Sequence, residues 1–213
     1  MEINGVKIKW LGHAGFKISN SKIVYIDPFK ISEVSEEEKG DFILITHEHY
    51  DHCSIEDVQK LVKQDTIVVT VADCQSKLSS VVNLIKDVKL VKPYDNLDFG
   101  EVKIKAVPAY NKDKEFHPKS NEWVGFVVEI NGVKIYHTGD TDLIDEIKEV
   151  EADVLLVPVG GTYTMNAEEA AELANTIKPK IAIPMHYGSI VGSKEDALKF
   201  KELVEPGIKV FFE

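Results

Sequence analysis

Residues 46–53 read THEHYDHC and directly follow the apolar run FILI, so one short loop holds three of the chain's seven histidines and an aspartate. Imidazole nitrogens and carboxylate oxygens bind divalent metals near neutral pH. His47 and His49 project to one side in extended backbone, and Asp51 and His52 can reach a second point nearby. One zinc ion takes about four ligands. These residues, with distant partners, therefore predict two neighbouring ions; the alternative is a polar turn whose histidines cap backbone groups.

The strands and helices predicted around this loop are short. Apolar or alternating runs bounded by turn residues predict strands, and Asn131-Gly132 predicts a hairpin. The predicted strands cover 6–12, 14–19, 22–29, 42–46, 66–71, 88–92, 102–109, 123–130, 133–139, 152–159, 180–185 and 208–212. Apolar residues at helical spacing predict one helix capped by Ser54, a weaker one from Asp73 to about Ile85, one over 166–177 begun by Asn166, and a last over 193–204. Strands followed by helices in each half predict two sheets packed face to face, with helices outside.

The bulk composition predicts one globular domain over residues 1–213. Hydrophobic residues make up 44% of the chain and charged residues 29%, as in ordinary folded proteins. The formal net charge of -11 argues against a nucleic-acid partner. Two cysteines form no disulfide framework. The N-terminus has no apolar leader and no run approaches about 18 apolar residues, which predicts a cytoplasmic protein without a membrane span.

Several motifs of the chain occur in the order of a known family. THEHYDH matches a His-x-His-x-Asp-His signature; WLGHAGF and YIDPF precede it, and IYHTGDTD and IPMHYG follow it. On these motifs, which span nearly the whole chain, the sequence resembles the metallo-β-lactamase superfamily, in the branch that includes L-ascorbate-6-phosphate lactonase and N-acyl-phosphatidylethanolamine phospholipase D. The resemblance implies an α+β fold: a four-layer αββα sandwich of two mixed β-sheets flanked by helices, with a metal site at one edge.

The resemblance also implies a ligand for each ion. His47 and His49 would bind the first ion, and Asp51 with His52 the second. Asp140, in TGDTD, matches the carboxylate that bridges the two ions. His186, in PMHYG, matches the last ligand of the second ion. A buried aspartate can also simply cap a turn, and a histidine in a turn can be satisfied by backbone groups.

The third histidine of the first ion is where the chain departs from the family pattern. Related proteins place it in a Pro-Ala-x-His context after a strand, but here the stretch reads VPAYN, so Asn111 stands at that position. His117, a little downstream on the same polar loop, is the predicted replacement. The alternative is a first site without a protein ligand there, with Asn111 holding a water or contacting substrate.

Four further residues are candidates for a supporting or a structural role. His13, in WLGHAGF, either supports the site or contacts substrate, or else packs in a turn. Asp27, in YIDPF, either accepts the N–H of a ligand histidine or initiates a turn before proline. His137 lies in a strand and is predicted to be structural, because neighbouring strand positions face opposite ways. Cys53 is predicted to be a small buried residue rather than a ligand.

These features predict a binuclear metal-dependent hydrolase. Two divalent ions, zinc or else manganese, would use a bridging hydroxide to cleave an ester, lactone or phosphodiester bond in a small substrate. Asp51 is the predicted catalytic residue, because its carboxylate can accept a hydrogen bond from the nucleophile. Lys112, Lys114 and Lys119 lie near the predicted metal edge and could attract an anionic substrate, although interleaved lysines and acids are usual in a solvated loop.

The sequence is also compatible with two other classes of function. The same loop can hold two irons in redox enzymes, and the Asn111 departure permits a metal-binding protein without catalysis. No nucleic-acid partner is expected, and a small-molecule substrate is the predicted ligand.

Overall fold

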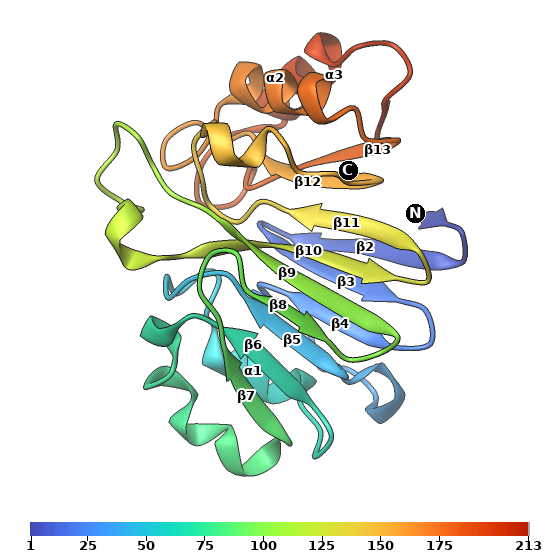
Figure 1. Ribbon diagram of the computed structural model, residues 1–213, viewed down its shortest axis with the longest axis vertical. Helices are drawn as coiled ribbons and strands as arrows, with labels where there is room; N and C mark the ends of the chain where they lie inside the picture. Colours follow the sequence, from blue (N-terminus) through green and yellow to red (C-terminus); the bar gives the residue numbers. More distant parts are fainter. Residues whose placement is uncertain (213) are drawn as a thin grey trace.

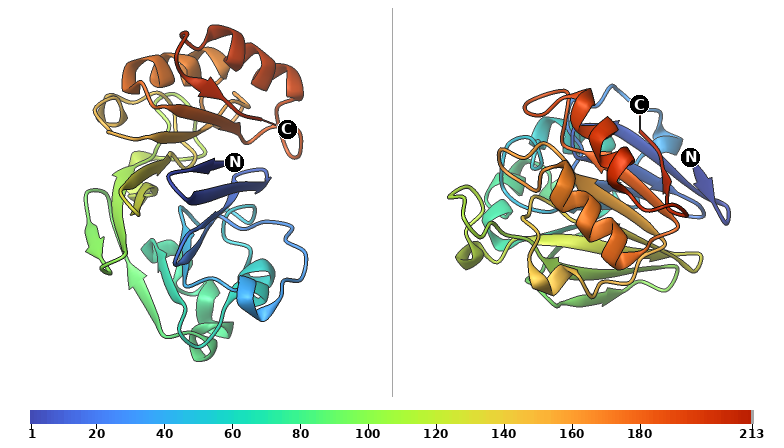
Figure 2. Two further views of the ribbon diagram at one scale, coloured as in Figure 1. Left: turned by 90° about the vertical axis from the view of Figure 1, so that its right-hand side faces the viewer. Right: turned by 90° about the horizontal axis from the view of Figure 1, so that it is seen from above.

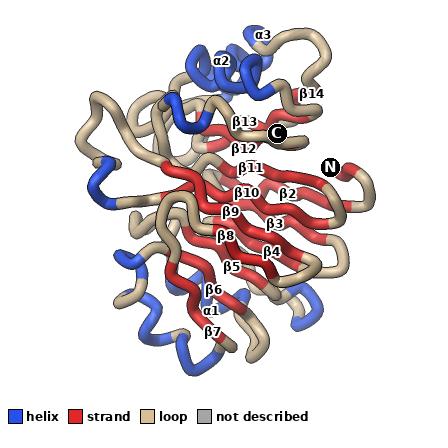
Figure 3. The backbone as a smooth tube through the Cα atoms, in the orientation of Figure 1, coloured by secondary structure: helices blue, strands red, loops and turns tan. Residues whose placement is uncertain are grey.

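A computed structural model describes residues 1–212 of the chain. These residues form two seven-stranded sheets, each built by one half of the chain (Figure 1). The left view of Figure 2 shows the blue strands near the N-terminus and the green strands that begin the second half as two separate layers. Figure 3 shows helices at both ends of this pair of layers. The predicted α+β sandwich of two mixed sheets flanked by helices is therefore confirmed.

The first sheet follows chain order from β1 to β7. Strands β1 to β4 pair antiparallel and strands β4 to β7 pair parallel. The strands are β1 (Glu2–Ile3), β2 (Val6–Gly12), β3 (Gly15–Ser19), β4 (Ile23–Ile26), β5 (Phe42–Ile45), β6 (Ile67–Thr70) and β7 (Asp87–Leu90).

The second sheet repeats this pattern, with β8 to β11 antiparallel and β11 to β14 parallel. The strands are β8 (Asn96–Asp98), β9 (Val102–Pro108), β10 (Val124–Ile130), β11 (Val133–His137), β12 (Val154–Pro158), β13 (Ile181–Met185) and β14 (Lys209–Val210). The predicted hairpin joins β10 to β11, with Asn131 and Gly132 both at positive φ, as a two-residue turn of this kind requires.

Three α-helices and several short 3₁₀ turns complete the described structure. The helices are α1 (Ile55–Leu61), α2 (Ala167–Ile177) and α3 (Lys194–Leu203). The 3₁₀ turns are η1 (Glu36–Glu38), η2 (Ala72–Cys74), η3 (Lys77–Ser80), η4 (Val82–Leu84), η5 (Lys119–Asn121) and η6 (Asp145–Ile147). Asn166 caps α2 through a reciprocal pair of hydrogen bonds with Glu169, as its position before the helix predicts.

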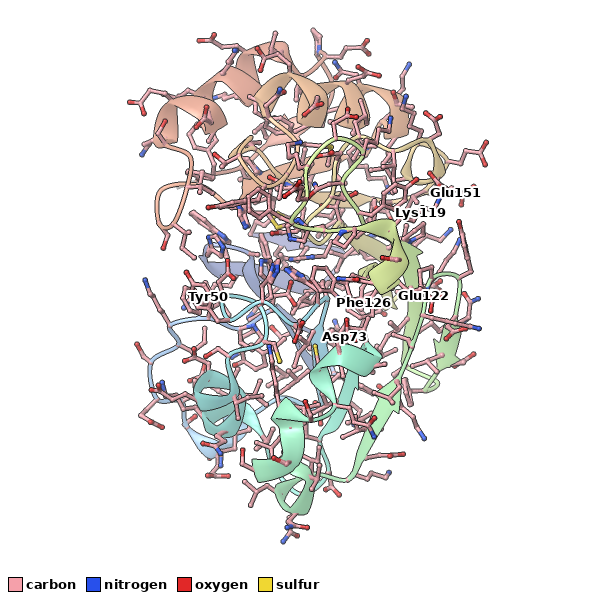
Figure 4. All side chains as sticks on the ribbon, turned by 90° about the vertical axis from the view of Figure 1, so that its left-hand side faces the viewer. Tyr50, Asp73, Lys119, Glu122, Phe126 and Glu151 are labelled. Carbon is pink, nitrogen blue, oxygen red and sulfur yellow. The ribbon has the colours of Figure 1, made fainter. Side chains whose placement is uncertain are left out.

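The core lies between the two sheets. Phe16 and Ile18 of β3 share one fully buried cluster with Phe126 and Val128 of β10 (Phe126 is labelled in Figure 4). Residues two apart on a strand face the same side, which is why alternate positions supply this layer. Burial of each such side chain contributes roughly 1.5–3 kcal/mol. A second apolar cluster, which includes Phe200 of α3, lies between the second sheet and helices α2 and α3.

Three predictions about local structure need correction. The segment from Asp73 to Ile85 is a series of 3₁₀ turns and not one helix, because its run Ser-Ser-Val-Val combines residues that disfavour helix interiors. Ser54 stands at the N-cap position of α1 as predicted, but its hydroxyl donates to Asp57 and makes no capping bond to the α1 backbone. Strands β1 and β8 were not predicted, because two or three residues are too few to show an alternating pattern.

Gly125 of β10 lies against the backbone at the end of β11, which leaves no room for a side chain. A Cβ at this position would lie 2.4 Å from the carbonyl oxygen of Thr138 and 2.6 Å from that of His137. We expect Gly125→Ala to lower the free energy of unfolding by about 3 kcal/mol, because backbone must move to accept the methyl group. Urea denaturation measures this change. Gly40→Ala, whose Cβ would meet its nearest atoms at 3.1 Å, is the control and should cost under about 1 kcal/mol. Equal losses in the two variants would contradict this reading.

No helix among residues 1–212 is both long enough and apolar enough to cross a membrane. The described helices are short elements packed on the two sheets.

Candidate metal centre

The candidate metal centre lies where several strands of both sheets end. His13 follows β2, Asp27 follows β4, residues 46–53 follow β5, Asp140 lies shortly after β11 and His186 follows β13. Strands β4 and β5 are parallel, as are β11, β12 and β13, so each set ends at one edge of its sheet. Figure 4 looks at this side of the molecule and labels Tyr50, on the loop of the first half, and Lys119, on the loop of the second.

The carboxylate of Asp140 lies among histidines from three parts of the chain. Its Oδ2 is 3.1 Å from Nε2 of His186, 3.4 Å from Nε2 of His52 and 3.4 Å from Nε2 of His117. All four side chains are buried. The structure thus brings together residues that are up to 134 positions apart in the sequence (52 to 186).

Potential ligand atoms form groups around this carboxylate, and within each group the atoms lie within 4.8 Å of one another. The groups are His47, His49 and His117; His13, Asp51, His52 and His186; and His47, His52 and Asp140. Every predicted ligand belongs to at least one of them. The third group joins the first two, which places Asp140 between two sets of ligand atoms.

Asp27 orients two of the histidines. Its Oδ2 accepts a hydrogen bond of 2.7 Å from Nδ1 of His52 and one of 2.6 Å from the hydroxyl of Thr46. Since that hydroxyl donates its proton to Asp27, its oxygen accepts from Nδ1 of His47, 2.9 Å away. Both imidazoles therefore carry a proton on Nδ1 and direct Nε2 to the centre. The structure favours the first reading of Asp27, and the role of Thr46 was not predicted from the sequence.

Asn111 orients His117 by accepting hydrogen bonds from it. Its Oδ1 accepts from the backbone N–H and from Nδ1 of His117, at 3.1 and 2.9 Å. Its Nδ2 donates to Asp142 and to the carbonyl oxygen of Tyr163, at 3.0 and 2.9 Å. All the hydrogen-bonding capacity of this buried amide is thus used within the protein. Asn111 holds His117 with Nε2 directed at Asp140, and it is His117 that reaches the cluster.

We expect Asn111→Ala to weaken metal binding at the His117 side by about 10- to 100-fold, the usual effect of removing a group that orients a ligand histidine. His117→Ala should instead remove one equivalent of metal. Competition titration with a chelator measures both. Asn96→Ala, an exposed asparagine on β8, is the matched control. Unchanged stoichiometry in His117→Ala would place the third ligand elsewhere.

His13 supports Asp51. Its Nε2 donates to Oδ2 of Asp51 over 2.8 Å, and its ring centroid is 4.0 Å from that of His186. The structure therefore favours a supporting role for His13 over simple turn packing. His13, Asp27 and His186 all have φ between 44° and 59°, a region that non-glycine residues occupy infrequently. Such strained positions collect where the surrounding structure needs a specific side-chain direction.

The local charges hold the carboxylates in their ionised form. Burial alone would raise the pKa of Asp140, but His186 and His52 outweigh burial and hold this pKa well below its usual value. Burial alone would lower the pKa of His52, yet Asp140 and Asp27 hold it well above its usual value. Burial opposes the ionised form of Asp51 too, but the hydrogen bond from His13 lowers its pKa to about 2.

The residues fit a metal on their own structural evidence. Six buried atoms of the cluster residues have no hydrogen-bond partner within residues 1–212: Nδ1 of His13 and of His186, and four others, which are Nε2 of His52, of His117 and of His186 and Oδ1 of Asp140. An unsatisfied buried polar atom costs about 1–3 kcal/mol, and native proteins contain few of them. A divalent cation would satisfy the last four of these atoms, since imidazole nitrogen and carboxylate oxygen are its common ligands.

The remaining candidates lie outside the cluster. His137 is fully buried; its Nε2 donates to the carbonyl oxygen of Ala14, and its Nδ1 accepts from the N–H of Gly139. These contacts agree with the predicted structural role. Cys53 is buried and belongs to none of the metal-capable groups found among the described residues.

Two lysines of the loop around His117, Lys114 and Lys119, pair with acids of the chain, whereas Lys112 is exposed. Lys114 pairs with Asp142, and Lys119 pairs with Glu146 over 2.9 Å. Asp142 also accepts from the backbone N–H of Lys112. These contacts hold the loop against the segment that follows β11, which contains Asp142 and Glu146.

Comparison with known proteins agrees with this geometry. Residues 7–186 match the family model described as the β-lactamase superfamily domain. A protein of Thermococcus onnurineus named UPF0173 metal-dependent hydrolase is 35% identical over 210 residues, which cover 93% of this chain and 92% of the relative. A structure described as a metal-dependent hydrolase of Parabacteroides distasonis is 30% identical and superposes with a TM-score of 0.84 over 97% of this chain and 91% of the other.

A structure from Thermotoga maritima, described as a zinc-dependent hydrolase of the metallo-β-lactamase superfamily, superposes with a TM-score of 0.63 at 27% identity and covers 96% of each chain. The chain therefore belongs to the β-lactamase superfamily, in the group that its UPF0173 relatives represent.

Proposed function

We propose that the protein is a hydrolase that uses two divalent metal ions, zinc or manganese, to cleave an ester, lactone or phosphodiester bond in a small substrate. The observation that carries the proposal is the position of Asp140, whose carboxylate lies within 3.1–3.4 Å of histidine nitrogens from both sets of ligand atoms. The names of the relatives, metal-dependent hydrolases, support the same class of reaction.

Each set of ligand atoms would bind one of the two ions. His47, His49 and His117 would hold the first ion; Asp51, His52 and His186 the second; and Asp140 would be shared between them. The first half of the chain supplies His47, His49, Asp51 and His52, and the second half supplies His117, Asp140 and His186. We therefore propose that residues 1–213 act as one domain, because neither half alone completes either set.

A bound pair of divalent ions supplies Lewis acidity, which lowers the pKa of water and polarises a substrate oxygen. The chain supplies the remaining functions. Asp51 lines the pocket in front of the cluster and is ionised at neutral pH because its pKa is about 2. Its carboxylate would accept a hydrogen bond from the attacking water, and His13 would hold that carboxylate in place. Asp27 and Asn111 would keep the ligand histidines in their metal-binding tautomers.

Activity and metal content measured on the same samples test this function. Protein loaded separately with zinc, manganese and iron would be assayed on generic lactone, thioester and phosphodiester substrates, before and after chelation. We expect turnover with about two equivalents of zinc or manganese and its loss on chelation. Preferential iron binding with oxygen uptake would indicate a redox enzyme instead. Stoichiometric metal without turnover on any substrate would indicate a binding role.

A further inference from the structure

A pocket of about 220 Å³ opens directly in front of the metal cluster. Its polar lining consists of residues of the cluster: His49, Asp51, His117, Asp140 and His186. Such a volume is small even among small-molecule sites, which commonly range over about 300–1,000 Å³. The substrate group that enters must therefore be compact.

The other side of the pocket is aromatic. Tyr50, Phe116 and Tyr163, which we call the aromatic wall, come from three separate loops and line the pocket together with Ile190. The rings of Phe116 and Tyr163 meet edge to face with centroids 4.5 Å apart. Tyr50 is 66% exposed and Phe116 is 49% exposed. Large exposed rings that gather at one pocket indicate a surface that a ligand covers.

The aromatic wall is tied to the metal cluster. The amide of Asn111 donates to the backbone carbonyl of Tyr163 and accepts from His117. Tyr50 lies within the loop that carries His49 and Asp51. The position of the wall relative to the reacting groups is therefore set by the same contacts that orient the ligands.

The pocket offers no side-chain cation to an anionic substrate. The chain contains no arginine, and no lysine is among the described residues that line this pocket. Lys114 and Lys119, on the adjoining loop, are paired with Asp142 and Glu146, and the exposed Lys112 of the same loop does not line the pocket. Recognition of carboxylate or phosphate groups usually relies on arginine or lysine, and the net charge of -11 adds long-range repulsion.

We propose that the aromatic wall selects substrates that are uncharged and carry a compact apolar or planar group beside the scissile ester or lactone carbonyl, with Phe116 as a specificity-determining residue. This inference rests on the proposed hydrolase function. It narrows the substrate class to carboxylic esters and lactones that carry no anionic group away from the scissile bond, since beyond the metal ions no lysine among the described residues lines the pocket.

The test compares between variants the ratio of activities on related lactones, so that the greater intrinsic reactivity of an aryl ester cancels. Dihydrocoumarin is δ-valerolactone with a fused benzene ring, and a carboxylated dihydrocoumarin adds one negative charge. The values of kcat/KM for the three are measured on zinc-loaded wild type, Phe116→Ala, Phe116→Leu and Phe211→Ala. Phe211 is 44% exposed, close to the exposure of Phe116, and does not line the pocket, so Phe211→Ala is the matched control. Ratios between substrates within one variant remove differences in metal loading.

We expect the preference for dihydrocoumarin over δ-valerolactone to fall about tenfold in Phe116→Ala, mainly through KM, since a ring contact of this kind is worth about one factor of ten. Phe116→Leu should lie between, because it keeps apolar volume without the ring plane, and Phe211→Ala should match wild type. The carboxylated lactone should be the poorer aromatic substrate in wild type. An unchanged preference in Phe116→Ala, or equal activity on the carboxylated lactone, would overturn the inference.

A binding measurement separates this inference from the hydrolase proposal. The neutral amides 3-phenylpropionamide and valeramide are titrated into the same zinc-loaded proteins by calorimetry. If no lactone is turned over but the phenyl amide binds more tightly than valeramide and loses that advantage in Phe116→Ala, the hydrolase proposal fails and the aromatic wall stands. If neither turnover nor binding depends on Phe116, the aromatic wall is rejected.

Discussion

Replacing Asp140 with asparagine is expected to lower kcat/KM by about a thousandfold, equivalent to about 4 kcal/mol of transition-state stabilisation. The substitution keeps the shape of the side chain and removes its charge. Because the carboxylate lies within 3.4 Å of histidines from both ligand sets, its loss should affect both ions. Bound metal should fall below two equivalents, whereas loss of a ligand from one set alone should spare the other ion.

The folding of Asp140→Asn should be measured alongside its metal content and activity, so that a loss of metal is not confused with unfolding. Circular dichroism and urea denaturation of the metal-free protein should show a folded variant, since asparagine adds no volume to the site. Asp145→Asn provides the same chemical change five positions away on η6, where the carboxylate is 88% exposed. That control should retain wild-type activity and metal. A fully active Asp140→Asn with two bound ions would remove the shared-ligand assignment.

Asp51→Asn is expected to lower kcat by about a hundredfold, the range found when a positioned acid–base group is lost. Asp51 faces the pocket, belongs only to the set with His52 and His186, and is held by His13. Metal analysis should therefore show a weakened second equivalent and an intact first one, in contrast to Asp140→Asn.

The pH dependence of Asp51→Asn follows from the pKa of about 2 in the folded protein. This value lies below the ordinary 3.8 of an aspartate, so the native contacts of the ionised carboxylate stabilise the fold above about pH 4 and are lost as pH falls towards 2. Between pH 6 and pH 9 the carboxylate does not titrate. The ratio of wild-type to variant kcat should thus stay constant over that range; a ratio that changes severalfold there would mean that Asp51, or a group coupled to it, titrates between pH 6 and pH 9 and would contradict this prediction.

Long and regular local patterns were sufficient to predict most of the fold. Strands such as β9 and β10 show apolar positions at the spacing that a buried face requires, and Asn-Gly identified the β10–β11 hairpin. The segment from Asp73 to Ile85 was predicted wrongly because its apolar spacing resembles a helix while its residues favour tight turns. Strands β1 and β8 are held by pairing with a neighbour, which is information that their own residues do not contain.

Local spacing in the sequence was sufficient to identify the residues of the candidate site. The cluster of histidines and aspartate after β5 and the motifs around Asp140 and His186 are visible as local spacing, and the structure brings these residues to one place. Their roles as metal ligands stay predictions that Asp140→Asn and Asp51→Asn test.

The hydrogen bonds that orient these residues depend on how the two sheets pack. In the sequence, Asn111 stands where related proteins have a ligand histidine. In the structure its side chain forms hydrogen bonds with His117, Asp142 and Tyr163, the last of them 52 positions away. Asp27 orients His52 across 25 positions and reaches His47 through Thr46. The physical reason is that a hydrogen bond needs its donor and acceptor within about 3 Å, and for residues so far apart in the chain that distance is set by the pairing and packing of the two sheets.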